Sequence, residues 1–396
     1  MSNKFNGERL RQARLYRKCT INELAEALGV SKQAISQYET QNQTPEFTKM
    51  RLITEILKFP SSYFFQQDSQ NIEETTTYFR ALLSTNKSDR LQQNTKIRHL
   101  AIIHEILCKY IEYPKLNLPK IPRELKENLT SENIEKIAML VREQWNLGVK
   151  PINDIIHVLE KNGIVITAYP IEKQIDAYSK MIKINNNERF IIVLSTDKDS
   201  AVRINFDAAH ELGHILLHDW CIDLEELSKE EFKQREKEAN NFAAAFLLPR
   251  QSFTREVAIF PKNLNYYLEL KRKWKASIPA MIIRAFNLDI ITDNQYQYLM
   301  KQLTFRKWRN PEPLDDVLLK SEPTLLKRSI DMLLDNNIFD VRTFLDELQT
   351  NNLSMEAEEV ENLLNLEKGK LSNFEQCYSP VSLELRIKNR WKCLLI

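Results

Sequence analysis

Three residues within one short stretch carry the clearest chemical signal in the sequence. His210, Glu211 and His214 form the pattern His-Glu-x-x-His inside SAVRINFDAAHELGHILLH, whose mixture of apolar and polar residues predicts a helix. Residues four apart lie on one face of a helix, so the two imidazoles can converge on one metal ion. Such donors favour Zn²⁺, and Glu211 would lie beside the open coordination position, where it can accept a proton from water. The pattern therefore predicts a hydrolase site.

A catalytic zinc ion typically needs a third protein ligand, and a second helix must provide it. The metzincin extension of the pattern is absent, because Leu217 occupies its glycine position. Our prediction is Glu238 in REKEANNFAAAFLLP, because it shares a helical stripe with Phe242 and a carboxylate on an apolar face needs a partner. Glu236, on a different side of the same helix, is the rival ligand. His218 is expected beside the ligands or on the substrate side.

The elements that must position these residues are predicted to be a small sheet and several helices. GIVITAYP, IDAYSKMIKI and ERFIIVLS are rich in β-branched and aromatic residues, which predicts three strands of a small antiparallel sheet. SENIEKIAMLVREQW before them and LNYYLELKRKW after them predict helices, and Ser277 is expected to begin a further helix. A basic cluster in this region is interpreted as a solvated helix face rather than a nucleic-acid contact: Lys271, Arg272, Lys273 and Lys275.

The N-terminal segment carries a second, independent pattern. Thr20 and Glu23 predict a capping box at the start of INELAEAL, and Gly29 predicts the end of that helix. Two short helices joined by a tight glycine turn are typical of a DNA-binding unit whose second helix enters the major groove. Ten Lys and Arg against six Asp and Glu in residues 1–66 favour phosphate contact. The residues expected to face DNA are Ser31, Lys32, Gln33, Ser36 and Gln37.

Both patterns resemble known families. The run LAEALGVSKQAISQYETQNQTPEF is similar to the XRE-like helix-turn-helix family of bacteriophage repressors, which implies a five-helix domain that binds operator DNA as a dimer. VRINFDAAHELGHILLH followed by EKEANNFAAAFLLP resembles the ImmA/IrrE family of zinc-dependent endopeptidases. That resemblance implies His210 and His214 as zinc ligands, Glu211 as general base and acid, and Glu238 as the third ligand.

Length and composition set the domain organisation. The chain has 396 residues with a formal net charge of +2, so it can hold two or three domains and any basic patch must be local. Six glycines disfavour a phosphate-loop architecture, a β-propeller or a large barrel. We expect a mostly helical α+β fold. Its expected parts are a helix-turn-helix domain in 1–66, a helical linker in 67–125, a zincin-like metallopeptidase domain in 126–300 and a helical C-terminal region in 301–396.

Cysteine usage and hydropathy predict the compartment. Five widely separated cysteines without a Cys-x-x-Cys pair are typical of a reducing cytoplasm, and the sequence has no apolar leader or membrane-length apolar run. The expected function is a cytoplasmic zinc endopeptidase that binds operator DNA, cleaves a regulatory protein such as a phage-type repressor, and forms a homodimer. Two alternatives stay open. One is a transcriptional regulator whose metal domain is a sensor or dimerisation body, and the other is the protease of a toxin-antitoxin or phage-defence system.

Overall fold

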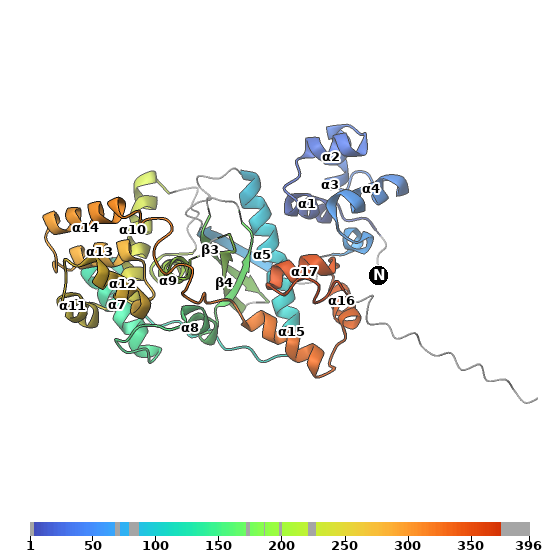
Figure 1. Ribbon diagram of the computed structural model, residues 1–396. Coiled ribbons are helices and arrows are strands. Elements are labelled where there is room, and N and C mark those ends of the chain that lie inside the picture. The colour runs from blue at the N-terminus through green and yellow to red at the C-terminus, as the bar shows by residue number, and fades with distance from the viewer. Residues whose placement is uncertain are drawn as a thin grey trace, which may run out of the picture.

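The protein is mostly helical, with one small sheet in the middle (Figure 1). The computed structural model describes residues 4–67, 87–171, 175–185, 187–197, 200–220 and 227–373, together with the backbone of residues 72–78. The mostly helical α+β class expected from the sequence is confirmed. None of the helices in this described part of the chain combines the length and apolar character needed to span a bilayer.

The helix-turn-helix region begins the chain. Its elements are α1 (Gly7–Tyr16), α2 (Ile21–Leu28), α3 (Lys32–Glu39), α4 (Phe47–Leu57) and a fifth, 3₁₀ helix η1 (Ser61–Phe65). Thr20 and Glu23 form the predicted capping box, and Gly29 ends α2 in the left-handed conformation at φ 63°. The Ser31 side chain accepts a hydrogen bond from the Ala34 backbone N–H at 3.1 Å and so begins α3.

The sheet has four strands in the order β1-β3-β4-β2. They are β1 (Ile72–Tyr78), β2 (Val165–Tyr169), β3 (Ala177–Ile184) and β4 (Asn187–Ser195). β3 pairs antiparallel with β1 and β4, but β2 pairs parallel with β4. The sheet is therefore mixed, not antiparallel as expected, because β2 lies beside β4 instead of beside its neighbour in sequence. β1 was also missed, since its polar sequence IEETTTY lacks the apolar alternation of a typical strand.

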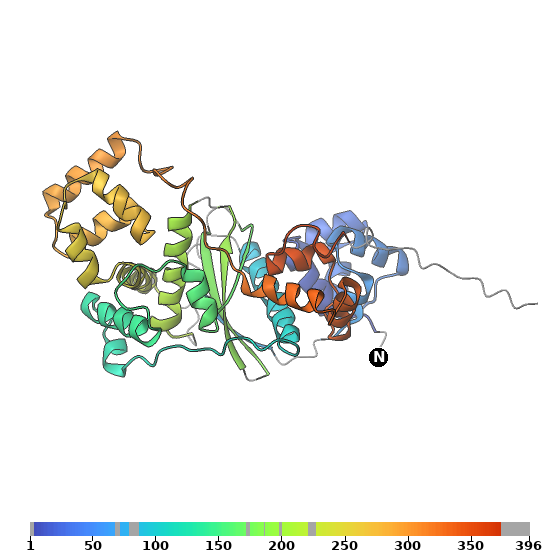
Figure 2. The ribbon, with the colours of Figure 1, turned by 60° about the horizontal axis from the view of Figure 1, so that its bottom comes forward.

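The two faces of the sheet contribute to two different hydrophobic cores. Alternate strand residues such as Ile166 and Ile192 pack with the helices around α9 and α10, whereas Tyr178 and Val193 pack with α5, the helix-turn-helix region and the C-terminal helices. Figure 2 shows these helices on opposite sides of the sheet. Since both faces are covered, β2 and most of β4 are buried along their length.

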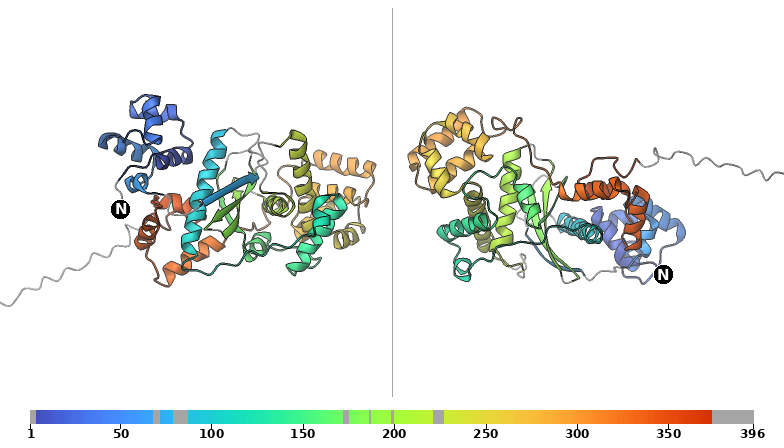
Figure 3. Two further views of the ribbon diagram at one scale, coloured as in Figure 1. Left: turned by 180° about the vertical axis from the view of Figure 1, so that it is seen from behind. Right: turned by 90° about the horizontal axis from the view of Figure 1, so that it is seen from below.

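The remaining helices form two groups. The first group is α6 (Arg123–Glu127), α7 (Ser131–Gln144), α8 (Ile155–Lys161), α9 (Ala201–Leu217), α10 (Lys229–Leu247), α11 (Arg250–Val257), α12 (Leu264–Trp274), α13 (Ile278–Asn287) and α14 (Asp293–Phe305). The second group, on the other face, is α5 (Lys87–Leu107), α15 (Leu325–Asp335), α16 (Val341–Thr350) and α17 (Ala357–Leu364) (Figure 3). Ser277 accepts a hydrogen bond from the Ala280 N–H and begins α13, as predicted.

The segment expected to be a linker is part of the packed structure. It supplies β1 and α5, and the α5 residues from Ile97 to Leu107 are largely buried in the second core. The C-terminal helices then dock on the helix-turn-helix region. Tyr16 donates a hydrogen bond to Glu359 at 2.9 Å, and Arg17 forms an ion pair with the same carboxylate at 2.5 Å. Within the residues that the structure describes, the helix-turn-helix region therefore packs in one continuous hydrophobic core with α5 and the C-terminal helices.

The basic cluster near residue 271 is a solvated face at Arg272 and Lys273, which are exposed, but not at Lys271. Lys271 is completely buried, and its Nζ contacts the carboxylates of Glu312 at 3.0 Å and Asp315 at 2.7 Å. It anchors the segment after α14 to α12. A basic run read along the sequence does not reveal that one member faces inward, because that depends on acidic residues about 40 positions away.

Candidate metal centre

Two helices that pack unusually closely hold the candidate site. α9 carries the His-Glu-x-x-His pattern, and α10 begins with a capping box formed by Ser228 and Glu231. A Cβ atom at Gly213 of α9 would lie 3.1 Å from Ala239 Cα and 3.2 Å from Phe242 Cδ1 of α10. The missing side chain at Gly213 thus lets the two backbones approach, and this places the first half of α10 beside the histidines.

Two imidazoles and one carboxylate converge at this crossing. His210 Nε2 lies 3.0 Å from His214 Nε2. Glu236 Oε1 lies 3.3 Å from His214 Nε2, and its Oε2 lies 3.6 Å from His210 Nε2. All three side chains are buried, and one ligand atom from each lies within 4.8 Å of the others. In the described part of the chain this is the group of side chains suited to hold a metal ion.

The carboxylate in this group is Glu236 and not the predicted Glu238. Glu238 Oε2 instead lies 3.1 Å from His218 Nε2, and Gln234 donates a hydrogen bond to Glu238 Oε1 at 2.7 Å. Two positions along a helix correspond to a rotation of about 200°, so the side chains of Glu236 and Glu238 leave α10 on nearly opposite sides. The stripe shared with Phe242 indicated burial of Glu238 correctly, but burial alone did not show which histidine it contacts.

The other ring nitrogens are held by neighbouring side chains. His210 Nδ1 lies 3.1 Å from Asn240 Oδ1, and His214 Nδ1 lies 2.9 Å from His218 Nδ1. These contacts leave both Nε2 atoms directed at the convergence point. His218 therefore contacts His214 from behind, and Glu238 lies behind His218. The sequence places Glu236 four residues before Asn240, on the same face of α10. The structure shows that this face meets His210, because Asn240 contacts the same imidazole.

Glu211 lies beside the group and is held from the sheet. It is buried, and Ser179 of β3 donates a hydrogen bond from Oγ to Glu211 Oε2 at 2.5 Å. Burial raises the pKa of the Glu211 carboxyl well above its usual value, and the nearby Glu236 charge adds to this, while the Ser179 hydrogen bond opposes it. Ser179 was not predicted. Its signal in the sequence is a small hydroxyl residue between Ala177 and Met181 on one face of the strand.

The donor set fits zinc. Imidazole nitrogens and a carboxylate oxygen are common ligands of catalytic zinc sites, which use three protein ligands and keep a fourth position open. Two nitrogens at ordinary zinc distances in a tetrahedral site are about 3.3 Å apart, close to the 3.0 Å between the two Nε2 atoms. A cation between these atoms would also balance the buried Glu236 charge.

The predicted DNA-facing residues lie on one exposed side of α3. Ile35 and Tyr38 are buried against the rest of the helix-turn-helix region. Arg14 of α1 fixes the end of α3 through an ion pair with Glu39 at 2.5 Å and a second hydrogen bond at 2.9 Å. The exposed set is Ser31, Lys32, Gln33, Ser36 and Gln37.

Comparison with known families finds a match for two segments of the chain. Residues 10–64 match the helix-turn-helix family model, and residues 159–286 match the Peptidase M78 model described as IrrE N-terminal-like domain. One segment of the chain is thus similar to helix-turn-helix domains, and a later segment is similar to IrrE-like peptidase domains. Both resemblances noted from the sequence are confirmed. The IrrE-like match spans α9 and α10, and its family implies a metallopeptidase. A search of the curated proteins finds no match.

Proposed function

We propose that the protein is a zinc-dependent endopeptidase coupled to a DNA-binding module, and that it cleaves a regulatory protein such as a phage-type repressor. The observation that carries this proposal is the convergence of His210, His214 and Glu236, with Glu211 beside them. In this proposal Glu236 takes the ligand role that the sequence assigned to Glu238.

Each side chain has a role that follows from its position. His210, His214 and Glu236 would hold Zn²⁺, which when bound supplies Lewis acidity to the attacking water and the scissile carbonyl. Glu211 takes the proton from water and passes it to the leaving amine, acting as general base and then general acid.

Ser179 and the pair His218–Glu238 act as positioning residues. The hydroxyl of Ser179 fixes one oxygen of Glu211 and so limits the rotation of that carboxylate. His218, supported by Glu238, fixes the plane of the His214 ring through the contact between their Nδ1 atoms.

The test of the peptidase is cleavage of a repressor encoded beside this protein. The zinc-loaded wild type is expected to cut it, and Glu211→Gln is expected to lose about a hundredfold or more of the rate, the usual range for a general acid-base group. Glu230→Gln, an exposed change in the first turn of α10, is the matched control and should cleave normally. Intact repressor with the wild type, or equal cleavage by Glu211→Gln, contradicts the proposal.

DNA binding is proposed for the exposed side of α3. Lys32 would contact phosphate, while Gln33 and Gln37 would address base edges in the major groove. Lys32→Gln is expected to weaken binding and to reduce the slope of log affinity against log salt by about 1. An unchanged slope would argue against docking of α3 in the groove.

The shared chain also explains how a slow peptidase could be selective. Binding of the helix-turn-helix domain near a DNA-bound repressor raises the effective concentration of substrate without any new contact. If zinc binds but Glu211→Gln leaves gene regulation unchanged, the metal domain acts as a sensor or dimerisation body instead. Cleavage of a cellular protein other than a repressor would favour a toxin-antitoxin or phage-defence role.

A further inference from the structure

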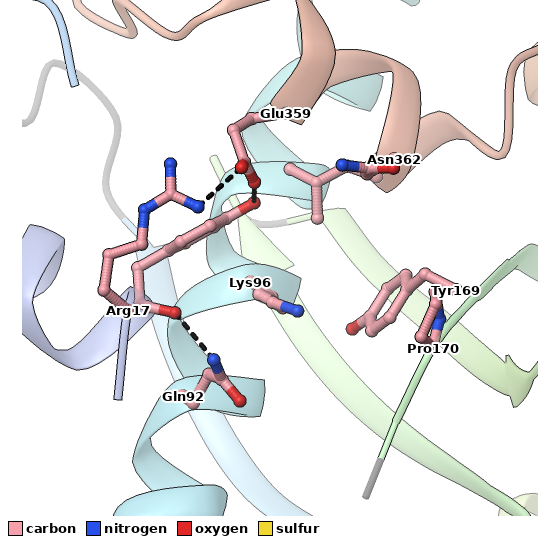
Figure 4. A pocket seen from close by; sticks show the side chains of 9 residues that line it. Arg17, Gln92, Lys96, Tyr169, Pro170, Glu359 and Asn362 are labelled. Carbon is pink, nitrogen blue, oxygen red and sulfur yellow. Dashed lines mark hydrogen bonds and ion pairs between the residues drawn. The ribbon is translucent and has the colours of Figure 1, made fainter. Parts of the chain in front are cut away.

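A pocket lies where the helix-turn-helix region, the sheet and the C-terminal helices meet. Its volume is about 380 Å³, within the range of small-molecule sites. Its walls come from the end of α1, from α5, from the end of β2 and from α17, as Figure 4 shows. This pocket lies on the face of the sheet opposite the candidate metal centre, since α5 and α17 pack against the second core.

One lysine dominates the chemistry of this pocket. Lys96 extends from α5 into the space beside Tyr169 (Figure 4). Its Nζ lies 4.9 Å from the centre of the Tyr169 ring and 5.7 Å from that of Tyr16. Among the described residues, no carboxylate lies within 4.0 Å of this ammonium group. Two aromatic faces replace only part of the water that an exposed lysine would have, and this burial lowers the pKa of Lys96.

The acidic residue in the pocket is already occupied. Glu359 accepts a hydrogen bond from the Tyr16 hydroxyl at 2.9 Å through one oxygen and pairs with Arg17 at 2.5 Å through the other. The lining therefore carries one net positive charge, which resides on Lys96. The amide of Asn362 at the exposed edge adds a hydrogen-bonding group, and Pro170 and Leu363 add apolar surface.

We propose that this pocket binds a small organic anion, whose phosphate or carboxylate group contacts the Lys96 ammonium while its body lies against Pro170 and Leu363. A charge-assisted hydrogen bond to an anion restores the polar contacts that Lys96 loses by partial burial. The walls of the pocket come from the helix-turn-helix region, from α5, from the sheet and from the C-terminal helices. A bound anion therefore also stabilises the packing of these elements against one another. The proposal does not depend on peptidase activity.

The experiment is calorimetric titration of the full chain with inorganic phosphate and, separately, with citrate. Saturable binding of either probe is expected, and the probe that binds identifies the acidic group of the ligand. Lys96→Met should reduce the affinity roughly tenfold or more, the effect of one charged hydrogen bond, whereas Lys96→Arg should retain most of it. Lys301→Met, an exposed lysine of α14, is the matched control and should bind like the wild type.

Three results would overturn the proposal. The first is the absence of saturable binding of both probes to the wild type at about 10 mM. The second is unchanged affinity in Lys96→Met, which would place the anion elsewhere. The third is a Lys96 effect on duplex DNA affinity without one on the small anions, which would assign the lysine to a DNA phosphate. Because Lys96→Met removes a partly buried charge and keeps a similar length, circular dichroism of this variant should match the wild type.

Discussion

The choice between Glu236 and Glu238 gives the sharpest prediction for the candidate metal centre. Glu236→Gln replaces a carboxylate that lies 3.3 Å from His214 Nε2 with a neutral group of the same shape. Loss of one partner from a buried charge pair costs about 3–5 kcal/mol, so the dissociation constant for zinc should rise roughly 200- to 5,000-fold. Glu238→Gln acts only through His218, and residues behind a metal ligand typically change affinity by about 10- to 100-fold.

The assay is a competition for zinc between each variant and a coloured chelator of known affinity. Glu230→Gln, exposed at the start of α10, should behave like the wild type and controls for the loss of one negative charge. The expected order of zinc affinity is wild type and Glu230→Gln, then Glu238→Gln, then Glu236→Gln. A greater loss in Glu238→Gln than in Glu236→Gln would refute the geometric argument and restore the assignment made from the sequence.

Three further predictions concern stability. Gly7→Ala should destabilise the helix-turn-helix region and weaken DNA binding, because the added Cβ would overlap the Tyr38 carbonyl at the end of α3; an unchanged melting temperature would contradict this. Burial lowers the pKa of His104 to about 3, so the folded state resists a proton that the unfolded chain accepts below its ordinary pKa of about 6.5. The free energy of unfolding should therefore decrease as the pH is lowered below about 6.5, by roughly 3 kcal/mol near pH 4.5. Chelator-treated His104→Leu should show a smaller decrease in denaturant titrations. Lys271→Met should cost about 3–5 kcal/mol, since it leaves the carboxylates of Glu312 and Asp315 without their cation; equal denaturation midpoints for variant and wild type would count against a structural role.

Local sequence was enough to predict features whose causes are local. The capping box at Thr20 and Glu23, the left-handed Gly29 and the helix start at Ser277 each depend on contacts within four residues, and the structure contains all of them. The spacing of His210 and His214 likewise placed both imidazoles on one side of α9.

The features that were missed depend on contacts between distant segments. The polar segment of β1 forms a strand by pairing with the edge of β3. β2 pairs with β4 on the side that β3 leaves open, and its direction there is parallel to β4. Ser179 reaches Glu211 across 32 positions of sequence. Nothing in the composition of the individual segments specifies these neighbours.

The sequence by itself therefore determined that two imidazoles and a glutamate share one helix, that a second helix must bring another carboxylate, and that a glycine turn presents the outer side of α3. Only the tertiary structure decided which carboxylate of α10 lies beside His210 and His214. The rotation of α10 about its axis is set by its packing on Gly213, through Ala239 and Phe242, and this packing turns Glu236 toward the histidines and Glu238 toward His218. Helical periodicity fixes the angle between two residues of one helix, but the face that meets a neighbour depends on side chains of both helices.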